Sequence, residues 1–102
     1  MKTSTMLFRG IELIRERGWC QYDYVSLDGQ MCIFAAPLIA AGIAENHIRR
    51  SRNRAIGKRI EDALMKVTMY EPEDFNNNEI HNENDAIATL YIAACCAAAE
   101  GN

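Results

Sequence analysis

Residues 5–17, TMLFRGIELIRER, decide the fold class, because they combine several signs of an amphipathic helix. Their apolar side chains recur at helical spacing and form one stripe, which comprises Met6, Leu7, Gly10, Ile11, Leu13 and Ile14. Hydroxyl side chains at residues 3–5 can cap the start of this helix, and Gly18 suits the left-handed position that ends it. The sequence therefore predicts a helix over about Thr5–Arg17.

The segment after this helix predicts a small β-hairpin near residues 22–33. Tyr22–Val25 is rich in strand-favouring side chains, and Met31–Ile33 would form the return strand. Asp28-Gly29 between them is typical of a two-residue type I′ turn, which needs positive φ at both positions. Two strands alone are marginally stable, so we expect this hairpin to lean on the helices.

Three further helices are predicted downstream. A short helix spans about residues 36–43, with Pro37 in its first turn, where the missing N–H does no harm. A longer helix carries the apolar stripe of Ile56–Val67, and the last helix runs to about Ala99 from Asn84, its expected N-cap. Pro72 and the asparagines at residues 76–78 predict a loop over Glu71–Glu83.

These elements predict a mainly α, single-domain bundle of about four helices with a small β-hairpin, spanning residues 1–102. The predicted core comprises Leu7, Ile11, Ile14, Trp19, Leu38, Ile39, Ile60, Leu64, Ile87, Leu90 and Tyr91. We see no secretory signal and no stretch near the ~20 apolar residues that a membrane span needs. We therefore expect a cytoplasmic protein that does not associate with membranes.

The four cysteines are expected to be reduced thiols, and they are Cys20, Cys32, Cys95 and Cys96. Cys95 and Cys96 are adjacent, so they are a poor pair for an ordinary disulfide. No C-x-x-C motif occurs, and the two histidines, His47 and His81, are far apart in the sequence. We therefore predict no metal and no cofactor.

One enzymatic hypothesis is open, in which Cys20 or Cys32 acts as a nucleophile with His47 as base. We favour the interpretation that both thiols are small core side chains. Carboxylate pairs such as Glu61-Asp62 are interpreted as solvated surface, and no phosphate-cradling glycine motif is present. The sequence therefore predicts a protein that is not an enzyme.

Charge divides the chain into two unequal parts. Residues 1–66 hold all eleven Lys and Arg and carry a net charge of +4, whereas residues 67–102 carry −7. The candidate basic surface comprises Arg49, Arg50, Arg52, Arg54, Lys58 and Arg59. It surrounds the start of the third predicted helix, where the helix dipole disfavours cations. The compensating anion could be the chain's own acidic segment, an acidic partner protein or nucleic-acid phosphate.

The acidic half offers a second candidate surface, which comprises Glu71, Glu73, Asp74, Glu79, Glu83 and Asp85. Such a surface could occupy a basic groove on a partner and block it. The simpler interpretation is an ordinary solvated loop.

The segment ELIRERGWCQ, Glu12–Gln21, resembles the opening of a small domain family of unknown function from bacteria and their phages. Members show a helix that ends in G-W-C, a short Asp-Gly hairpin, a helix start similar to CALGAL and a late Asn-Asp pair. Here the counterparts are Asp28-Gly29, Cys32–Ala36 and Asn84-Asp85. Pro37 and Glu83 depart from the pattern. The resemblance implies the architecture and a phage-linked origin, but no activity.

Size, split charge and suspected origin together favour an interaction protein as the function. We expect a phage-encoded protein that binds a host protein or ribonucleoprotein in the bacterial cytoplasm and inhibits it, as anti-defence proteins such as anti-CRISPRs do. The alternative is a nucleic-acid accessory protein that uses residues 49–59. The alanine-rich last helix also leaves a homodimer open.

Overall fold

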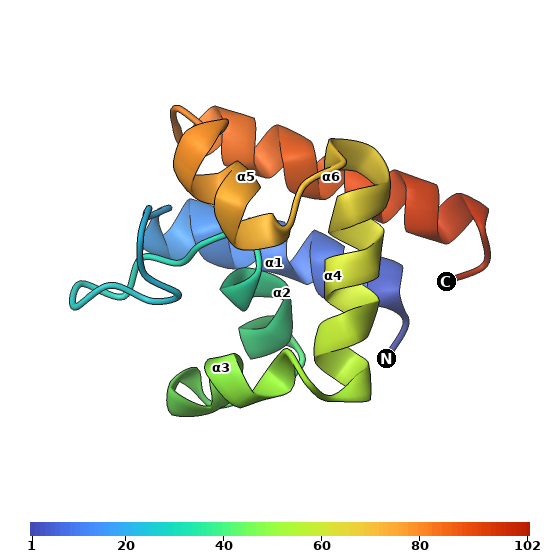
Figure 1. Ribbon diagram of the computed structural model, residues 1–102, viewed down its shortest axis with the longest axis horizontal. Helices are drawn as coiled ribbons and strands as arrows, with labels where there is room; N and C mark the ends of the chain where they lie inside the picture. The colour runs from blue at the N-terminus through green and yellow to red at the C-terminus, as the bar shows by residue number, and fades with distance from the viewer.

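Six α-helices build the fold in the computed structural model, which describes residues 1–102 (Figure 1). In chain order they are α1 (Thr3–Arg17), α2 (Ala35–Ala40), α3 (Ile48–Ser51), α4 (Ala55–Thr68), α5 (Pro72–Asn78) and α6 (Glu83–Ala99), and a 3₁₀ turn, η1 (Glu45–His47), precedes α3. The mainly helical class is therefore confirmed. The predicted count of four is too low, because α3 and α5 were not expected.

Helix α5 corrects the predicted loop over Glu71–Glu83. It begins with Pro72, whose ring presets the helical φ, and Glu73 and Asp74 lie in its first turn. These are ordinary signs of a helix start, but the asparagines that follow favour a loop, and the prediction followed them. The next helix, α6, begins two residues earlier than its predicted cap, Asn84, implied, because Asn82 accepts a 2.9 Å hydrogen bond from the backbone N–H of Asp85.

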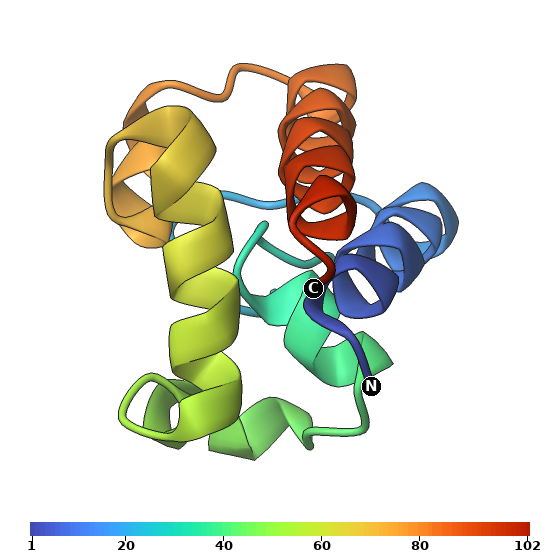
Figure 2. The same ribbon diagram turned by 90° about the vertical axis from the view of Figure 1, so that its right-hand side faces the viewer.

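Helices α1 and α6 lie side by side although they stand at opposite ends of the chain (Figure 2). Helix α6 buries a stripe of small side chains with one leucine, which comprises Ala86, Leu90, Ala93, Ala94 and Ala97. Small side chains let two helices approach closely. The prediction that Tyr91 belongs to the core is wrong, because α6 is apolar all round and its sequence pattern does not select a face.

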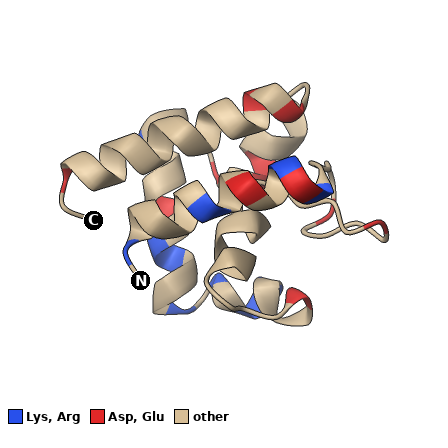
Figure 3. Ribbon diagram, turned by 180° about the vertical axis from the view of Figure 1, so that it is seen from behind, with Lys and Arg blue, Asp and Glu red and all other residues tan.

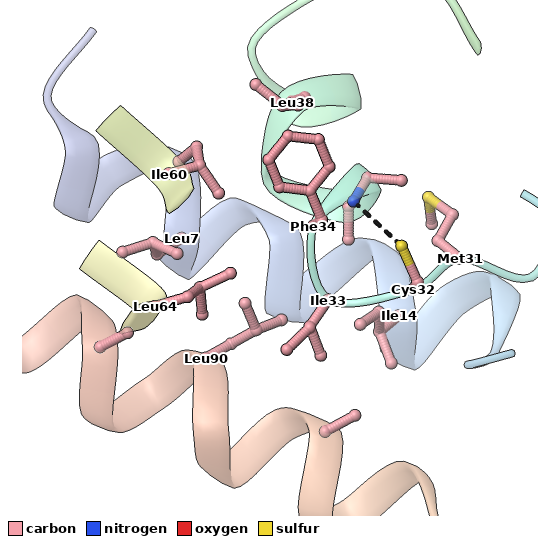
Figure 4. Packing of buried hydrophobic residues seen from close by; sticks show 14 of the residues in the cluster. Leu7, Ile14, Met31, Cys32, Ile33, Phe34, Leu38, Ile60, Leu64 and Leu90 are labelled. Atoms are coloured by element: carbon pink, nitrogen blue, oxygen red, sulfur yellow. Dashed lines mark hydrogen bonds between the residues drawn. The ribbon is translucent and has the colours of Figure 1, made fainter. Parts of the chain in front are cut away.

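The core is one cluster of 20 buried residues, which come from α1, α2, α4, α6 and the segment before α2, with Ile48 of α3 and Ile80 after α5. Of the predicted core residues, Leu7, Ile11, Ile14, Leu38, Ile60, Leu64 and Leu90 are buried, whereas Trp19, Ile39 and Ile87 are partly buried. Figure 4 shows Leu7, Leu64 and Leu90, from three different helices, pointing into this cluster. The helical stripes therefore predicted seven of the 20 core residues, but not the buried segment before α2 or the alanines of α6.

The β-hairpin predicted near residues 22–33 does not form. Met31 instead makes one bridge on each side, a parallel bridge to Trp19 and an antiparallel bridge to Val25. The turn between the two segments is also longer than predicted, because Ser26 N donates to Gln30 O at 2.8 Å. Tyr22 has φ +70°, which no extended strand accepts, so pairing stops there.

Two glycines of the helices are required by close backbone contacts. A Cβ atom on Gly10 of α1 would lie 2.9 Å from the backbone nitrogen of Pro37, so Gly10 lets α2 cross α1 closely. A Cβ atom on Gly57 would lie 1.7 Å from the carbonyl oxygen of Ser51. The sharp path from α3 into α4 therefore needs glycine at position 57.

None of these helices is both long and apolar enough to cross a membrane.

Candidate functional site

Asn76 of α5 is the centre of a buried polar network that orders the segment after α1. Its side chain is 1% exposed. Its Oδ1 atom accepts hydrogen bonds from Trp19 Nε1 at 2.8 Å and from the backbone N–H of Ile33 at 3.1 Å. Its Nδ2 group donates to Cys20 O at 3.0 Å and to Asn77 Oδ1 at 3.2 Å. All the hydrogen-bonding capacity of this buried amide is therefore used.

The next two residues of the loop are held to the same helix. Gln21 Nε2 donates to the carbonyl oxygens of Asn77 and Ile80, both at 3.1 Å. The backbone N–H of Tyr22 donates to Asn77 Oδ1 at 2.8 Å. These bonds fix Tyr22 in the left-handed region, where a non-glycine residue is strained. Its side chain is nevertheless 76% exposed, so little packing offsets that strain.

A cavity of about 250 Å³ lies where this loop meets α3 and α5, and we name it the Tyr22 pocket. It is lined by Tyr22, Asp23, Tyr24, Cys32, Arg49, Glu73, Asn76 and Asn77. The sequence interpretation missed it, because residues 22–24 were assigned to a strand and residues 73–77 to a loop. The lining is mainly polar and carries charges of both signs.

Behind the Tyr22 pocket, Arg52 lies between two carboxylates. Its guanidinium binds Glu61 and Glu73, and it also lies 5.6 Å from the centre of the Phe34 ring. Burial alone would lower the pKa of Arg52, but the hydrogen bond to Glu61 and the charge of Glu73 outweigh it and raise that pKa. With two carboxylates and one guanidinium, the group keeps a net charge of −1.

Tyr24 completes this group from the loop side. Its hydroxyl donates to Glu73 Oε2 at 2.9 Å. Burial, together with this hydrogen bond to Glu73, raises the pKa of Tyr24. The other oxygen of Glu73, Oε1, is buried and has no hydrogen-bond donor. The carboxylate therefore retains one unused acceptor, which is buried.

The candidate basic surface is divided by the structure. Arg52 is bound internally, and Arg59 donates to Thr3 Oγ1 at 3.0 Å and to the carbonyl oxygen of Met1 at 2.6 Å. The remaining four side chains form no ion pair, and they are Arg49, Arg50, Arg54 and Lys58. One cation of the basic surface, Arg52, is therefore neutralised by the chain's own acidic segment, to which Glu73 belongs.

The candidate acidic surface gathers at two helix starts. Glu73 and Asp74 lie in the first turn of α5, and Glu83 and Asp85 lie in the first turn of α6. Carboxylates there stabilise the positive end of the helix dipole. Glu71 and Glu79 are exposed at either end of α5. These acids therefore have a local structural role in addition to facing solvent.

An apolar surface between α1 and α6 was not predicted at all. A groove of about 500 Å³ is lined by the apolar side chains of Phe8, Ile11, Ile87, Ala88 and Tyr91, with Arg9, Glu12, Arg15 and Asn84 at its edges. Phe8 and Tyr91 meet edge to face, with ring centres 6.0 Å apart, and remain 39% and 56% exposed. Figure 3 shows α6 without a charged residue between its two ends. We name this surface the α1–α6 groove.

The enzymatic hypothesis needs a reactive thiolate at Cys20 or Cys32, and the structure does not favour one at either residue. Cys32 is buried, and this burial raises its pKa to about 12, so its thiol stays protonated at neutral pH. Burial also raises the pKa of Cys20, whose thiol donates to backbone carbonyl oxygens. His47 and His81 are exposed. No three His, Cys, Asp or Glu side chains lie close enough together to hold a metal ion.

Comparison with known proteins gives one match. Residues 1–95 match the model of a family of unknown function, DUF6197. The chain belongs to the DUF6197 family. This match covers nearly the whole chain, and it confirms the resemblance to a domain family of unknown function that residues 12–21 suggested. No curated protein and no solved structure matches this DUF6197 protein.

Proposed function

We propose that this protein is a non-enzymatic interaction protein that binds another protein through the α1–α6 groove. The observation that carries the proposal is the apolar surface itself, which remains exposed although the core beside it is complete. Tyr91 is more than half exposed, and no charged residue interrupts α6 between Asp85 and Glu100. Contiguous apolar surface of this kind marks protein interfaces, and exposed tyrosine is enriched there.

The charges at the edge of the groove define the partner further. Arg15 is paired with Glu12 at 3.1 Å, but Arg9 has no carboxylate partner. A complementary segment would pack apolar side chains against Phe8 and Tyr91 and place a carboxylate near Arg9. The proposed partner surface is therefore apolar with an acidic edge.

The suspected phage origin supports a more specific role. Small domains of this kind from bacteria and their phages would act in the cytoplasm of a bacterial host, where a tight stoichiometric complex can inhibit a host protein or ribonucleoprotein. An anti-defence function is the form of this role that we propose. The family resemblance supports this anti-defence role, whereas the exposed apolar side chains of α1 and α6 support the binding surface.

Affinity capture from the natural host, with a matched pair of variants, tests the proposal. Tyr91→Lys places a charge in the groove, whereas Met69→Lys places one at an exposed apolar residue at the end of α4. We expect a stoichiometric partner on the wild type and on Met69→Lys, and its loss on Tyr91→Lys. The purified partner should then bind with the same pattern.

Three outcomes would count against this function. They are the absence of any stoichiometric partner, a partner that Tyr91→Lys still retains, and a homodimer in light scattering that Tyr91→Lys dissociates. The last outcome would assign the groove to a second copy of the chain instead.

A second candidate function is nucleic-acid binding by the four unpaired cations of the basic surface. Arg49 and Arg50 lie on α3, Arg54 precedes α4, and Lys58 follows in its first turn. The start of α4 has no side-chain cap, so its free N–H groups add to the positive potential. Phosphate would be the complementary ligand.

Salt dependence separates this candidate from the first. Binding to DNA or RNA should weaken steeply with salt, and Arg50→Ala with Arg54→Ala should reduce the logarithmic slope by about 2. Arg9→Ala, an unpaired arginine on α1, is the control and should leave the slope unchanged. If the double variant binds nucleic acid with the same salt dependence as the wild type, the basic surface is not the binding site.

A further inference from the structure

We infer that the Tyr22 pocket binds a free α-amino acid, with Arg49 holding its carboxylate and with Asp23 and Glu73 holding its ammonium group. This site is separate from the α1–α6 groove and does not depend on the function proposed above. Four features of the pocket lead to this ligand.

The first feature is a pair of opposite charges that do not neutralise each other. Arg49 lines the same cavity as Asp23 and Glu73, yet it forms no ion pair with either carboxylate within 4.0 Å. A small cavity whose walls carry separated positive and negative groups is complementary to a zwitterion. A guanidinium is well suited to a carboxylate, which it can bind through two parallel hydrogen bonds.

The second feature is an excess of negative charge on the side of the ammonium group. Arg52 is shared between Glu61 and Glu73, which leaves a net charge of −1 behind the pocket. Asp23 and Glu73 line this side of the pocket. An ammonium group brings one positive charge, so it offsets the negative charge there.

The third feature is the size of the cavity. Its volume of about 250 Å³ lies just below the range of roughly 300–1,000 Å³ that is typical of pockets for drug-sized ligands, so it suits a smaller ligand such as an amino acid.

The fourth feature is the strained residue at the edge of the pocket. Tyr22 keeps an aromatic side chain where its backbone favours glycine and where the ring is 76% exposed. A strained residue of this kind is a common mark of a binding site. Its ring and that of Tyr24 can cover the ammonium group through cation–π contact.

Amide shifts in ¹⁵N-labelled full-length protein, with each standard L-amino acid titrated separately, test this inference. We expect at least one amino acid to shift the backbone amides of residues 22–24 and 73–77 in a saturable way. Its N-acetyl derivative lacks the ammonium group and its amide derivative lacks the carboxylate, so each should bind about 10-fold more weakly or worse.

Neighbouring arginines provide the matched variants. Arg49→Gln should weaken binding about 10-fold, whereas Arg50→Gln, which is adjacent but outside the pocket, should change it less than about 2-fold. Tyr91→Lys should leave amino-acid binding intact, so failure of the protein-binding proposal and failure of this one are distinguishable.

The inference is overturned if no standard amino acid produces saturable shifts at millimolar concentration. It is equally overturned if the blocked derivatives bind as well as the parent amino acid, or if Arg49→Gln binds like Arg50→Gln.

Discussion

At the scale of single residues, the loop after α1 is ordered by side chains and not by a β-sheet. Asn76 supplies the donors and acceptors that strand pairing would otherwise provide, since it bonds to Trp19, Cys20 and Ile33. One buried amide therefore holds two segments that lie more than 40 positions away in the sequence. Its neighbours in the asparagine run have no comparable burial.

Replacing this amide should be costly. Asn76→Ala leaves Trp19 Nε1, the N–H of Ile33 and Cys20 O without their partner, and each buried group left unsatisfied costs about 1–3 kcal/mol. We expect the free energy of unfolding to fall by at least about 3 kcal/mol in urea denaturation. Asn78→Ala, in the same run but exposed, should change it by less than about 0.5 kcal/mol. Equal effects of the two substitutions would contradict the role given to Asn76.

Tyr22 permits a test of backbone strain. Tyr22→Gly and Tyr22→Ala both remove the exposed ring, but only glycine accepts φ +70° without cost. We expect Tyr22→Gly to be more stable than Tyr22→Ala by about 1 kcal/mol in thermal or urea unfolding. If alanine proves the more stable variant, residue 22 is not held in the left-handed region in solution.

At the scale of elements, the sequence predicted α1, α2, α4 and α6 but not α3 and α5. Long amphipathic stripes such as those of α1 and α4 repeat their signal over several turns. Helices α3 and α5 have one or two turns each, and contacts with the rest of the chain fix them. The Tyr22 pocket could not be predicted for the same reason, since it exists only after α5 docks beside the loop.

The junction of α3 and α4 shows how a local rule is overridden by packing. Gly57 lies within α4, where alanine would normally favour the helix by up to about 1 kcal/mol. Here Gly57→Ala should instead destabilise the protein, by about 1–3 kcal/mol or more, because the added methyl group collides with the backbone at Ser51.

Urea unfolding of Gly57→Ala beside Lys58→Ala measures this effect. Lys58 is exposed on the same turn, so its substitution by alanine should be close to neutral. A stabilised Gly57→Ala variant would show that α3 does not approach α4 as described.

At the scale of the whole molecule, the core separates the four cysteines into two classes. Cys20 and Cys32 are buried beside α1 and α2, and Cys95 and Cys96 are exposed on α6. The sequence predicted four reduced thiols and the burial of the first two. It predicted the exposed face of α6 incorrectly, since it placed Tyr91 in the core, because alanine, cysteine and isoleucine surround that helix on all sides.

Thiol labelling checks this separation and the enzymatic hypothesis together. With a disulfide reagent at neutral pH, we expect Cys95 and Cys96 to react quickly. Cys20 and Cys32 should react only at the rate of unfolding, because burial hides them and raises the pKa of both. Mass spectrometry after timed quenching identifies the labelled residues. Rapid labelling of Cys20 or Cys32 in the folded protein would restore a nucleophilic role.

The pairing of α1 with α6 has a consequence during synthesis on the ribosome. The apolar stripe of α1 is made first, and α2 can pack against it early, but α6, which also covers it, is completed roughly 80 residues later. At about 5–20 residues per second, the surface of α1 that α6 covers stays open for on the order of 4–16 s. During that interval this surface is accessible to chaperones, so the yield of folded protein in cells should depend on how fast the message is translated.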